Sequence, residues 1–127
     1  MPSLNHVQLI GNLGKDPETR FSPTGKKACN FTMAVNRHWK SREGEVKEAT
    51  EWFNVEAWGR LGEICQQYLS KGRLVYVEGW LHTNRYEHEG ETRYFTKVIA
   101  SKMQILDKKV DVEVETAVEE EEDIPPE

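Results

Sequence analysis

The chain has 127 residues, a length that fits one domain and lets its body bury roughly two thirds of the surface that would be exposed on unfolding. Its charge is uneven, because residues 1–109 carry all 17 Lys and Arg against 13 acids, whereas residues 110–127 carry nine acids and no base. The sequence has no apolar run of membrane-spanning length and no signal-peptide pattern, so we expect a cytoplasmic protein with no membrane partner. The basic body suggests a polyanionic partner, although solvated charge is an equally common reason for such a balance.

The first half of the chain predicts three strands. The segment "HVQLIGNLG" (residues 6–14) begins as a strand and ends in a glycine break, and turn signals follow as far as residue 27. "ACNFTMAVN" (residues 28–36) forms the second strand, with alternate apolar side chains. Residues 37–50 are too charged for a core and predict a long loop or a protruding hairpin. "EWFNVEAWG" (residues 51–59) is the third strand.

The second half predicts one helix and two long strands. Residues 60–72 carry apolar side chains at helical spacing and end at Lys71 and Gly72. Residues 73–86 and 93–106 form the last two strands, joined by a glycine-containing turn. This order predicts an all-β OB-fold, a five-stranded Greek-key barrel with a short helix between strands three and four. We assign the OB-fold domain to residues 1–109 and a disordered acidic tail to residues 110–127.

The third strand presents two tryptophans on its polar face. Because side chains alternate along a strand, Phe53, Val55 and Ala57 share the face that we expect in the core. Trp52 and Trp58 fall on the opposite face, where we expect them to be exposed. An exposed tryptophan forgoes a few kcal/mol of burial, which suggests that another apolar surface covers it. That surface is a loop, a second subunit or a ligand.

Further aromatic residues lie among basic ones. Trp39 is close in sequence to Arg37 and Lys40, and Tyr86 follows Arg85. Aromatic side chains interleaved with Lys and Arg form a stacking platform, because each nucleobase presents a flat face and cations follow the phosphates. A duplex hides its base faces, so the pattern favours single-stranded nucleic acid.

The fourth strand carries another exposed pair. Val75, Val77 and Leu81 share the core parity, which places Tyr76 and Trp80 outside. We interpret Tyr76 and Trp80 as subunit contacts, with base stacking as the alternative.

Three ordered blocks, "NHVQLIGNLGKDPETRFSPTG", "TEWFNVEAWGRLGEICQQYLSKG" and "VYVEGWLHTNRYE", resemble the bacterial single-stranded DNA-binding protein family from about Leu4 to Leu106. The resemblance implies an OB-fold that assembles as a homotetramer and has no enzymatic activity. It also implies sequence-independent binding and protection of single-stranded DNA during replication, recombination and repair.

Carried across by position, the resemblance also implies DNA-binding residues, with stacking on Trp39, Trp52, Trp58 and Tyr86 and phosphate contacts at Arg60, Lys71 and Arg93. The basic neighbours of these aromatic residues, Arg37, Lys40 and Arg85, complete the predicted DNA-binding set. Tyr94 completes a basic-aromatic pair with Arg93, and Phe53 matches a subunit-contact position, so it joins Tyr76 and Trp80 in the predicted interface. Some members have arginine where this chain has Asn54, His82 and Asn84, so phosphate contacts there are expected to be fewer or to move to Arg73, Arg85 and Lys97.

The acidic tail resembles the peptide with which family members dock on replication and repair proteins. Asp123, Ile124 and Pro125 match the tip of that peptide, whereas Pro126 and Glu127 depart from it. We expect weaker partner binding than for a typical tip, and competition between the tail and DNA for the basic surface. The alternative is a solvated tail that serves solubility.

Other functional classes fit the sequence less well. Glu51 and Glu56 fall on opposite strand faces, and no nucleophile-base set accompanies them, which disfavours an enzyme. Cys29 and Cys65 lie in apolar patterns and predict buried free thiols, and the histidines lack ligand spacing, so we expect no metal and no cofactor. An OB-fold adaptor or an oligosaccharide binder shares the fold, but the aromatic-basic pattern favours DNA.

Overall fold

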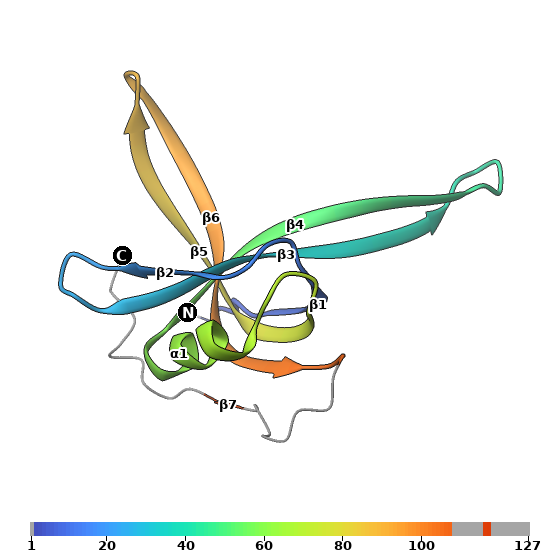
Figure 1. The fold of residues 1–127 in the computed structure, drawn as a ribbon. Coiled ribbons are helices and arrows are strands. Elements are labelled where there is room, and N and C mark those ends of the chain that lie inside the picture. Colours follow the sequence, from blue (N-terminus) through green and yellow to red (C-terminus); the bar gives the residue numbers. More distant parts are fainter. Residues whose placement is uncertain (1, 108–115, 118–127) are drawn as a thin grey trace.

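The computed structural model describes residues 2–107 and the backbone of residues 116–117, and it shows a small barrel from which two long hairpins project (Figure 1). In chain order the elements are β1 (Val7–Leu13), β2 (Glu18–Phe21), β3 (Lys27–Lys40), β4 (Val46–Trp58), α1 (Gly59–Tyr68), β5 (Leu74–His88), β6 (Glu91–Ile105) and β7 (Thr116–Ala117). Since β1, β3, β4, β5 and β6 form the barrel and α1 lies between β4 and β5, the predicted OB-fold is confirmed.

The sheet closes through β1. Its strand order is β1-β5-β6-β4-β3-β2, and β1 pairs again with β3 at Asn12 and Leu13. β4 and β6 run parallel and pair at two positions, Val55 with Val98 and Glu56 with Ile99. Closure satisfies backbone groups that a sheet edge would otherwise leave unpaired.

Alternating apolar side chains fill the barrel. α1 packs against β3 and β4 and contributes Leu61 and Cys65, both fully buried, to the same core. Each large side chain buried in this way contributes about 1.5–3 kcal/mol relative to exposure. The other principal core residues are Leu9, Leu13, Cys29, Phe31, Met33, Val55, Val75, Val77, Val98 and Met103.

The two hairpins that leave the barrel are called here the β3–β4 arm (residues 34–52) and the β5–β6 arm (residues 82–97); they point in different directions (Figure 1). In the first arm β3 and β4 remain paired as far as Lys40 and Val46, so the protruding-hairpin alternative for residues 37–50 is confirmed. The second arm turns at Glu89 and Gly90, whose φ values of 52° and 79° lie in the left-handed region that tight hairpins need.

Three local predictions were wrong. Residues 18–21 were expected in a turn-rich segment but form β2, which pairs with β3; all four side chains are exposed, so no apolar alternation marks the strand. The helix ends at Tyr68 instead of continuing to Lys71. Leu81 was expected in the core but is 44% exposed, because it lies at the last position of β5 before the strand enters the β5–β6 arm.

The C-terminal segment is described at two residues. The backbone of Thr116 and Ala117 pairs with Met103 and Lys102 of β6 as the short strand β7. The rest of the predicted tail, including Asp123, Ile124 and Pro125, lies outside the described residues. Within residues 2–107 and 116–117, no helix has the length and apolar character needed to cross a membrane.

Candidate nucleic-acid interface

The β3–β4 arm carries two exposed indoles and a cation. Trp39 is 42% exposed and Trp52 is 60% exposed. The guanidinium carbon of Arg37 lies 4.8 Å from the centre of the Trp39 ring, within range for a cation–π interaction. A guanidinium Nη2 of the same Arg37 lies 3.7 Å from Oε2 of Glu51 across the hairpin. The positive charge of Arg37 therefore lies over one face of the partly exposed Trp39 ring.

Trp52 rests against Gly14, just after β1. A Cβ atom placed on Gly14 would lie 2.5 Å from Cζ3 of Trp52 and 3.0 Å from Oγ1 of Thr32. Such a separation is too short for any side chain, so the indole uses the space that glycine leaves free. The sequence marked Gly14 as a strand break, whereas the structure also makes it a support for Trp52.

Trp58 is buried, which corrects the prediction that it is exposed. Only 7% of its surface is accessible, and it packs with Ala28, Ile99 and Trp80. The physical reason is the closure of the barrel. Because β6 pairs with β4 near this end, Ile99 of β6 and Trp80 of β5 cover the outer face of the sheet at Trp58. Parity correctly assigned Trp58 to the outer face but could not show that this face is covered.

A buried ion pair holds the Trp58 indole. Glu56 is 8% exposed, and its Oε1 accepts a hydrogen bond of 2.8 Å from Nε1 of Trp58. The ammonium of Lys97 lies 2.9 Å and 3.0 Å from the two carboxylate oxygens. The charge of Lys97 is thus paired with the Glu56 carboxylate. In the same way, Nη1 of Arg73 lies 3.4 Å from Oδ1 of Asp107. Neither is an exposed phosphate contact of the kind the sequence suggested.

The β5–β6 arm repeats the aromatic-basic arrangement. Tyr86 is 45% exposed and stands opposite Arg93, while Tyr94, 66% exposed, stands opposite Arg85. Phe95, 42% exposed, is a further aromatic residue that the sequence reasoning did not single out. The sequence feature that could have identified Phe95 is its position directly after the basic-aromatic pair of Arg93 and Tyr94.

Two further predicted cations lie at the helical end of the molecule. Arg60 is exposed on α1, and Lys71 is exposed in the turn between α1 and β5. The backbone N–H of Lys71 donates to Oδ1 of Asp16 at 2.8 Å, which ties that turn to the segment after β1. Lys40 lies near the end of the β3–β4 arm, so the predicted cations are spread over both arms and this turn.

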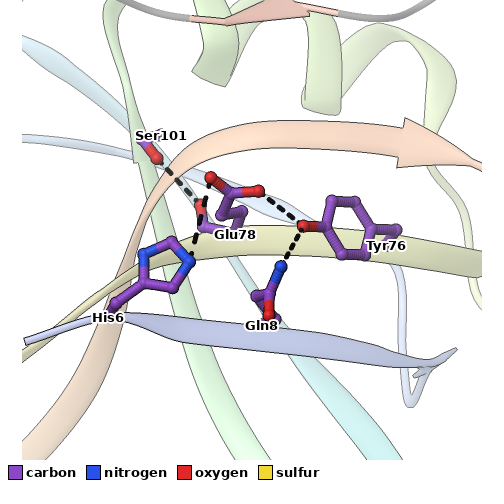
Figure 2. A network of polar contacts seen from close by, with 5 residues as sticks. All are labelled: His6, Gln8, Tyr76, Glu78 and Ser101. Carbon is purple, nitrogen blue, oxygen red and sulfur yellow. Dashed lines mark hydrogen bonds and ion pairs between the residues drawn. The ribbon is translucent and has the colours of Figure 1, made fainter.

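The predicted subunit-contact residues differ in their surroundings. Phe53 and Trp80 are half-buried against the core and the Trp58 cluster, respectively. Tyr76 belongs to a polar network across β1, β5 and β6 (Figure 2). Its hydroxyl donates to Glu78 and accepts from Nε2 of Gln8 at 3.1 Å. The bond to Glu78 raises the pKa of Tyr76 above its usual value.

The two cysteines are free and buried, as predicted. Burial raises the pKa of Cys29 to about 12 and also raises that of Cys65, so both thiols stay protonated at neutral pH. Among the residues that the structure describes, no group of three or more His, Cys, Asp or Glu could hold a metal ion.

The closed barrel, with aromatic and basic side chains on two projecting arms, places this protein in the class of OB-fold proteins, whose barrels bind oligonucleotides or oligosaccharides. A model of the Single-strand binding protein family matches residues 4–106. The single-stranded DNA-binding protein 1 of Chlorobaculum tepidum is 44% identical over 108 residues, which cover 84% of this chain and 67% of that protein. A single-stranded DNA-binding protein of Neisseria meningitidis serogroup A is also 44% identical, over 82% of this chain and 60% of that protein.

Solved structures agree. A Plasmodium falciparum SSB in complex with ssDNA has a TM-score of 0.78 and 32% identity, covering 84% of this chain and 98% of that one. A deletion mutant of the Thermus aquaticus single-stranded DNA-binding protein has a TM-score of 0.74 and 31% identity. The match covers 82% of this chain and 51% of that one.

The chain belongs to the single-strand binding protein family, so the resemblance inferred from the sequence is confirmed. The matched part spans about two thirds or less of the curated relatives' length. Those relatives are named as DNA-binding proteins and not as enzymes, in agreement with the expected absence of catalysis.

Proposed function

We propose that the chain binds single-stranded DNA without strong sequence preference and protects it during replication, recombination and repair. The observation that carries the proposal is the exposure of Trp39, Trp52 and Tyr86 beside cations on the two arms. Large apolar surfaces that a monomer leaves in water have a partner elsewhere, and a nucleobase fits a flat ring beside a positive charge. Membership of the single-strand binding family supports the same conclusion.

In this mechanism the strand follows both arms, with bases stacked on the exposed rings. Phosphates lie near the cations of the arms and of the helical end: Arg37, Lys40, Arg60, Lys71, Arg85 and Arg93. Stacking is worth about 1–3 kcal/mol per base and tolerates any base, since every base has a flat face. Trp58 supports the surface from beneath, because its burial leaves no face free for a base.

The test is a titration of the protein with oligo(dT), followed by tryptophan fluorescence and checked by gel shift. We expect strong quenching and an affinity that falls as salt rises, because phosphate binding releases counterions. A signal unchanged at low salt, with no retarded band, would refute the proposal. An uncharged oligosaccharide is the matched control, and salt-insensitive binding of that ligand would favour the other class of OB-fold binder.

We also propose a homotetramer whose subunits meet through Phe53, Tyr76 and Trp80. The partly exposed surface of these residues supports the proposal, since contact with another subunit would cover it. Light scattering at several protein concentrations gives the mass directly. A monomer at every concentration would leave this assignment without support.

For the acidic tail we propose docking of replication and repair proteins and competition with DNA. Truncation after Lys109 removes nine acids, so we expect tighter DNA binding at low salt and little change at high salt. Loss of partner capture by the truncated chain in a pull-down, with the full chain as control, tests docking at Asp123, Ile124 and Pro125. Equal DNA affinity of the two chains would leave a solubilising tail.

A further inference from the structure

A groove crosses the outer face of the sheet where the two arms leave the barrel, and no role assigned so far uses it. Its volume is about 80 Å³, which admits several water-sized groups and so suits one phosphate group. The side chains that line it include those of Lys15 after β1, Glu18 and Arg20 of β2, Asn54 of β4 and Phe95 of β6. We call it the inter-arm groove.

Strand pairing places the cations of the groove beside the exposed ring of Trp52. Arg20 pairs with Ala28 of β3, and Ala28 pairs in turn with Trp58 of β4. Directly opposed residues share one face of a sheet, and so do alternate residues of a strand, so Arg20 lies on the face of Trp58 and Trp52. Lys15 directly follows the glycine that supports the Trp52 ring. The inter-arm groove is therefore continuous with the surface that carries a proposed stacking ring.

The ion pairs of the groove differ in how firmly they are held. Lys97 and Glu56 are largely covered, and the ammonium lies 2.9 Å and 3.0 Å from the two carboxylate oxygens. Lys15 and Arg20 each lie 3.5 Å from a carboxylate oxygen of Glu18, and these three side chains are exposed. Strong charge-assisted hydrogen bonds are about 2.7–2.9 Å long, and exposed ion pairs contribute little stability. The Lys97 pair is thus a fixed part of the barrel, whereas the Glu18 carboxylate can be displaced.

The charge of the groove matches that of one phosphate of a DNA strand. The cations that line it are Lys15, Arg20 and Lys97, and the carboxylates paired with them are those of Glu18 and Glu56. Three positive charges and two negative charges leave a net charge of +1, whereas each phosphate of the DNA backbone carries one negative charge. A phosphate that displaces Glu18 would also gain the guanidinium of Arg20, whose planar donors fit two phosphate oxygens.

We propose that the inter-arm groove binds a phosphate of the DNA strand as it passes from one arm to the other, through Lys15 and Arg20, and that Glu18 masks both cations until DNA binds. This site rests on the proposed binding of single-stranded DNA, and its three residues lie outside the set assigned to that function. Phe95 is exposed on the β5–β6 arm and lines the same groove, so its ring can stack on the base next to this phosphate.

The experiment measures the affinity of the full chain and its variants for labelled oligo(dT) by fluorescence anisotropy at several salt concentrations. Glu18→Gln should strengthen binding by up to about five-fold, because the phosphate no longer has to displace a carboxylate. Lys15→Gln and Arg20→Gln should each weaken binding about two- to five-fold. In the double variant, the slope of log affinity against log salt should become shallower by about 0.7, the value for one phosphate of a single strand.

Two variants elsewhere on the surface are the matched controls. Lys27→Gln removes the same charge as Lys15→Gln, but Lys27 shares the face of Cys29, which packs in the core, and does not line the groove. Glu63→Gln removes the same charge as Glu18→Gln from the exposed surface of α1. Both controls should leave the affinity nearly unchanged, because salt screens charges that do not contact the strand. All variants should keep the melting temperature of the full chain, since the side chains are exposed.

The outcomes separate the phosphate site from the wider function. Opposite effects of Glu18→Gln and Lys15→Gln, with unchanged controls, would support the site. Equal affinities of Glu18→Gln and Glu63→Gln, or of Lys15→Gln and Lys27→Gln, would overturn the site and leave the proposed function in place. Failure of the unmodified chain to bind oligo(dT) refutes the proposed function itself and the phosphate site with it.

Discussion

The middle and the C-terminal end of β4 place the same type of side chain in opposite environments. Trp52 and Trp58 lie on one face of one strand, and each stands opposite an alanine of β3, Ala34 and Ala28 respectively. Yet Trp52 is 60% exposed and Trp58 is 7% exposed. The difference comes from the barrel, where Trp80 packs beside Trp58, whereas the arm leaves Trp52 open. Alternation along a strand assigns a side chain to a face, but closure of the sheet decides whether that face is covered.

Substitution of Trp58 should lower the stability of the protein far more than substitution of Trp52. Trp58→Ala removes a large buried ring and the partner of Glu56, so we expect the free energy of unfolding to fall by about 3–5 kcal/mol. Trp52→Ala, at the exposed position, should change this free energy by less than about 0.5 kcal/mol. Urea denaturation measures both. Equal stability losses would contradict the contrast.

The ion pair beneath Trp58 should matter almost as much. Lys97→Met leaves the buried Glu56 carboxylate without its cation, which we expect to cost about 3 kcal/mol of stability. Adding Glu56→Gln should restore much of the loss, because no buried charge then remains unpaired. The double variant is the control. An unchanged denaturation midpoint for Lys97→Met would show that the pair does not stabilise the barrel.

DNA affinity should fall when an exposed aromatic side chain is removed from either arm. Trp52→Ala removes a stacking surface and should weaken oligo(dT) binding by about 1–3 kcal/mol, measured by fluorescence anisotropy with a labelled oligonucleotide. Tyr86→Ala, on the other arm, should show a loss in the same range. Unaltered melting temperatures would confirm that both side chains act in binding and not in folding. Retention of full affinity by both variants would remove the arms from the binding surface.

A smaller effect is expected at Gly14. The added methyl group of Gly14→Ala would meet Cζ3 of Trp52 at 2.5 Å and force the ring to move. We expect binding to weaken by about 1 kcal/mol, less than for loss of the ring. In the Trp52→Ala background the same change should have no effect on affinity, because the ring it displaces is gone. Additive losses in the double variant would mean that Gly14 acts independently of Trp52.

The smallest expected effect is a pH dependence of the barrel. Burial opposes ionisation of Asp107, but hydrogen bonds from the Leu74 N–H and from Arg73 outweigh it and hold the pKa of Asp107 below its usual value. A lowered folded-state pKa stabilises the barrel above the unfolded-state pKa of about 4, and the contribution disappears as pH falls through the folded-state pKa. Asp107→Asn should flatten the stability profile in that acidic range. An identical profile would contradict this assignment.

Much of the fold was predictable because periodicity and turn chemistry act locally. The helix after Trp58 and the β5–β6 hairpin follow from apolar spacing and from a glycine turn, whereas the β3–β4 hairpin was predicted only as one of two alternatives. The short strand β2 escaped prediction, since its four side chains are exposed and backbone pairing alone defines it.

The candidate site was predictable only in part. The aromatic-basic pattern identified Trp39, Trp52 and Tyr86, which are all exposed. It could not identify the burial of Trp58, because that burial depends on strands distant in sequence meeting at the barrel. Such tertiary neighbours leave no periodic trace in a single sequence.

The closure of the barrel also bears on the speed of folding. The arms join residues that are near neighbours in the chain, whereas the bond between Gln8 of β1 and Tyr76 of β5 joins residues 68 apart. Closing so long a loop costs entropy before the contacts that reward it have formed, and distant pairings slow folding. The hairpins are therefore expected to form early and the docking of β1 to set the folding rate.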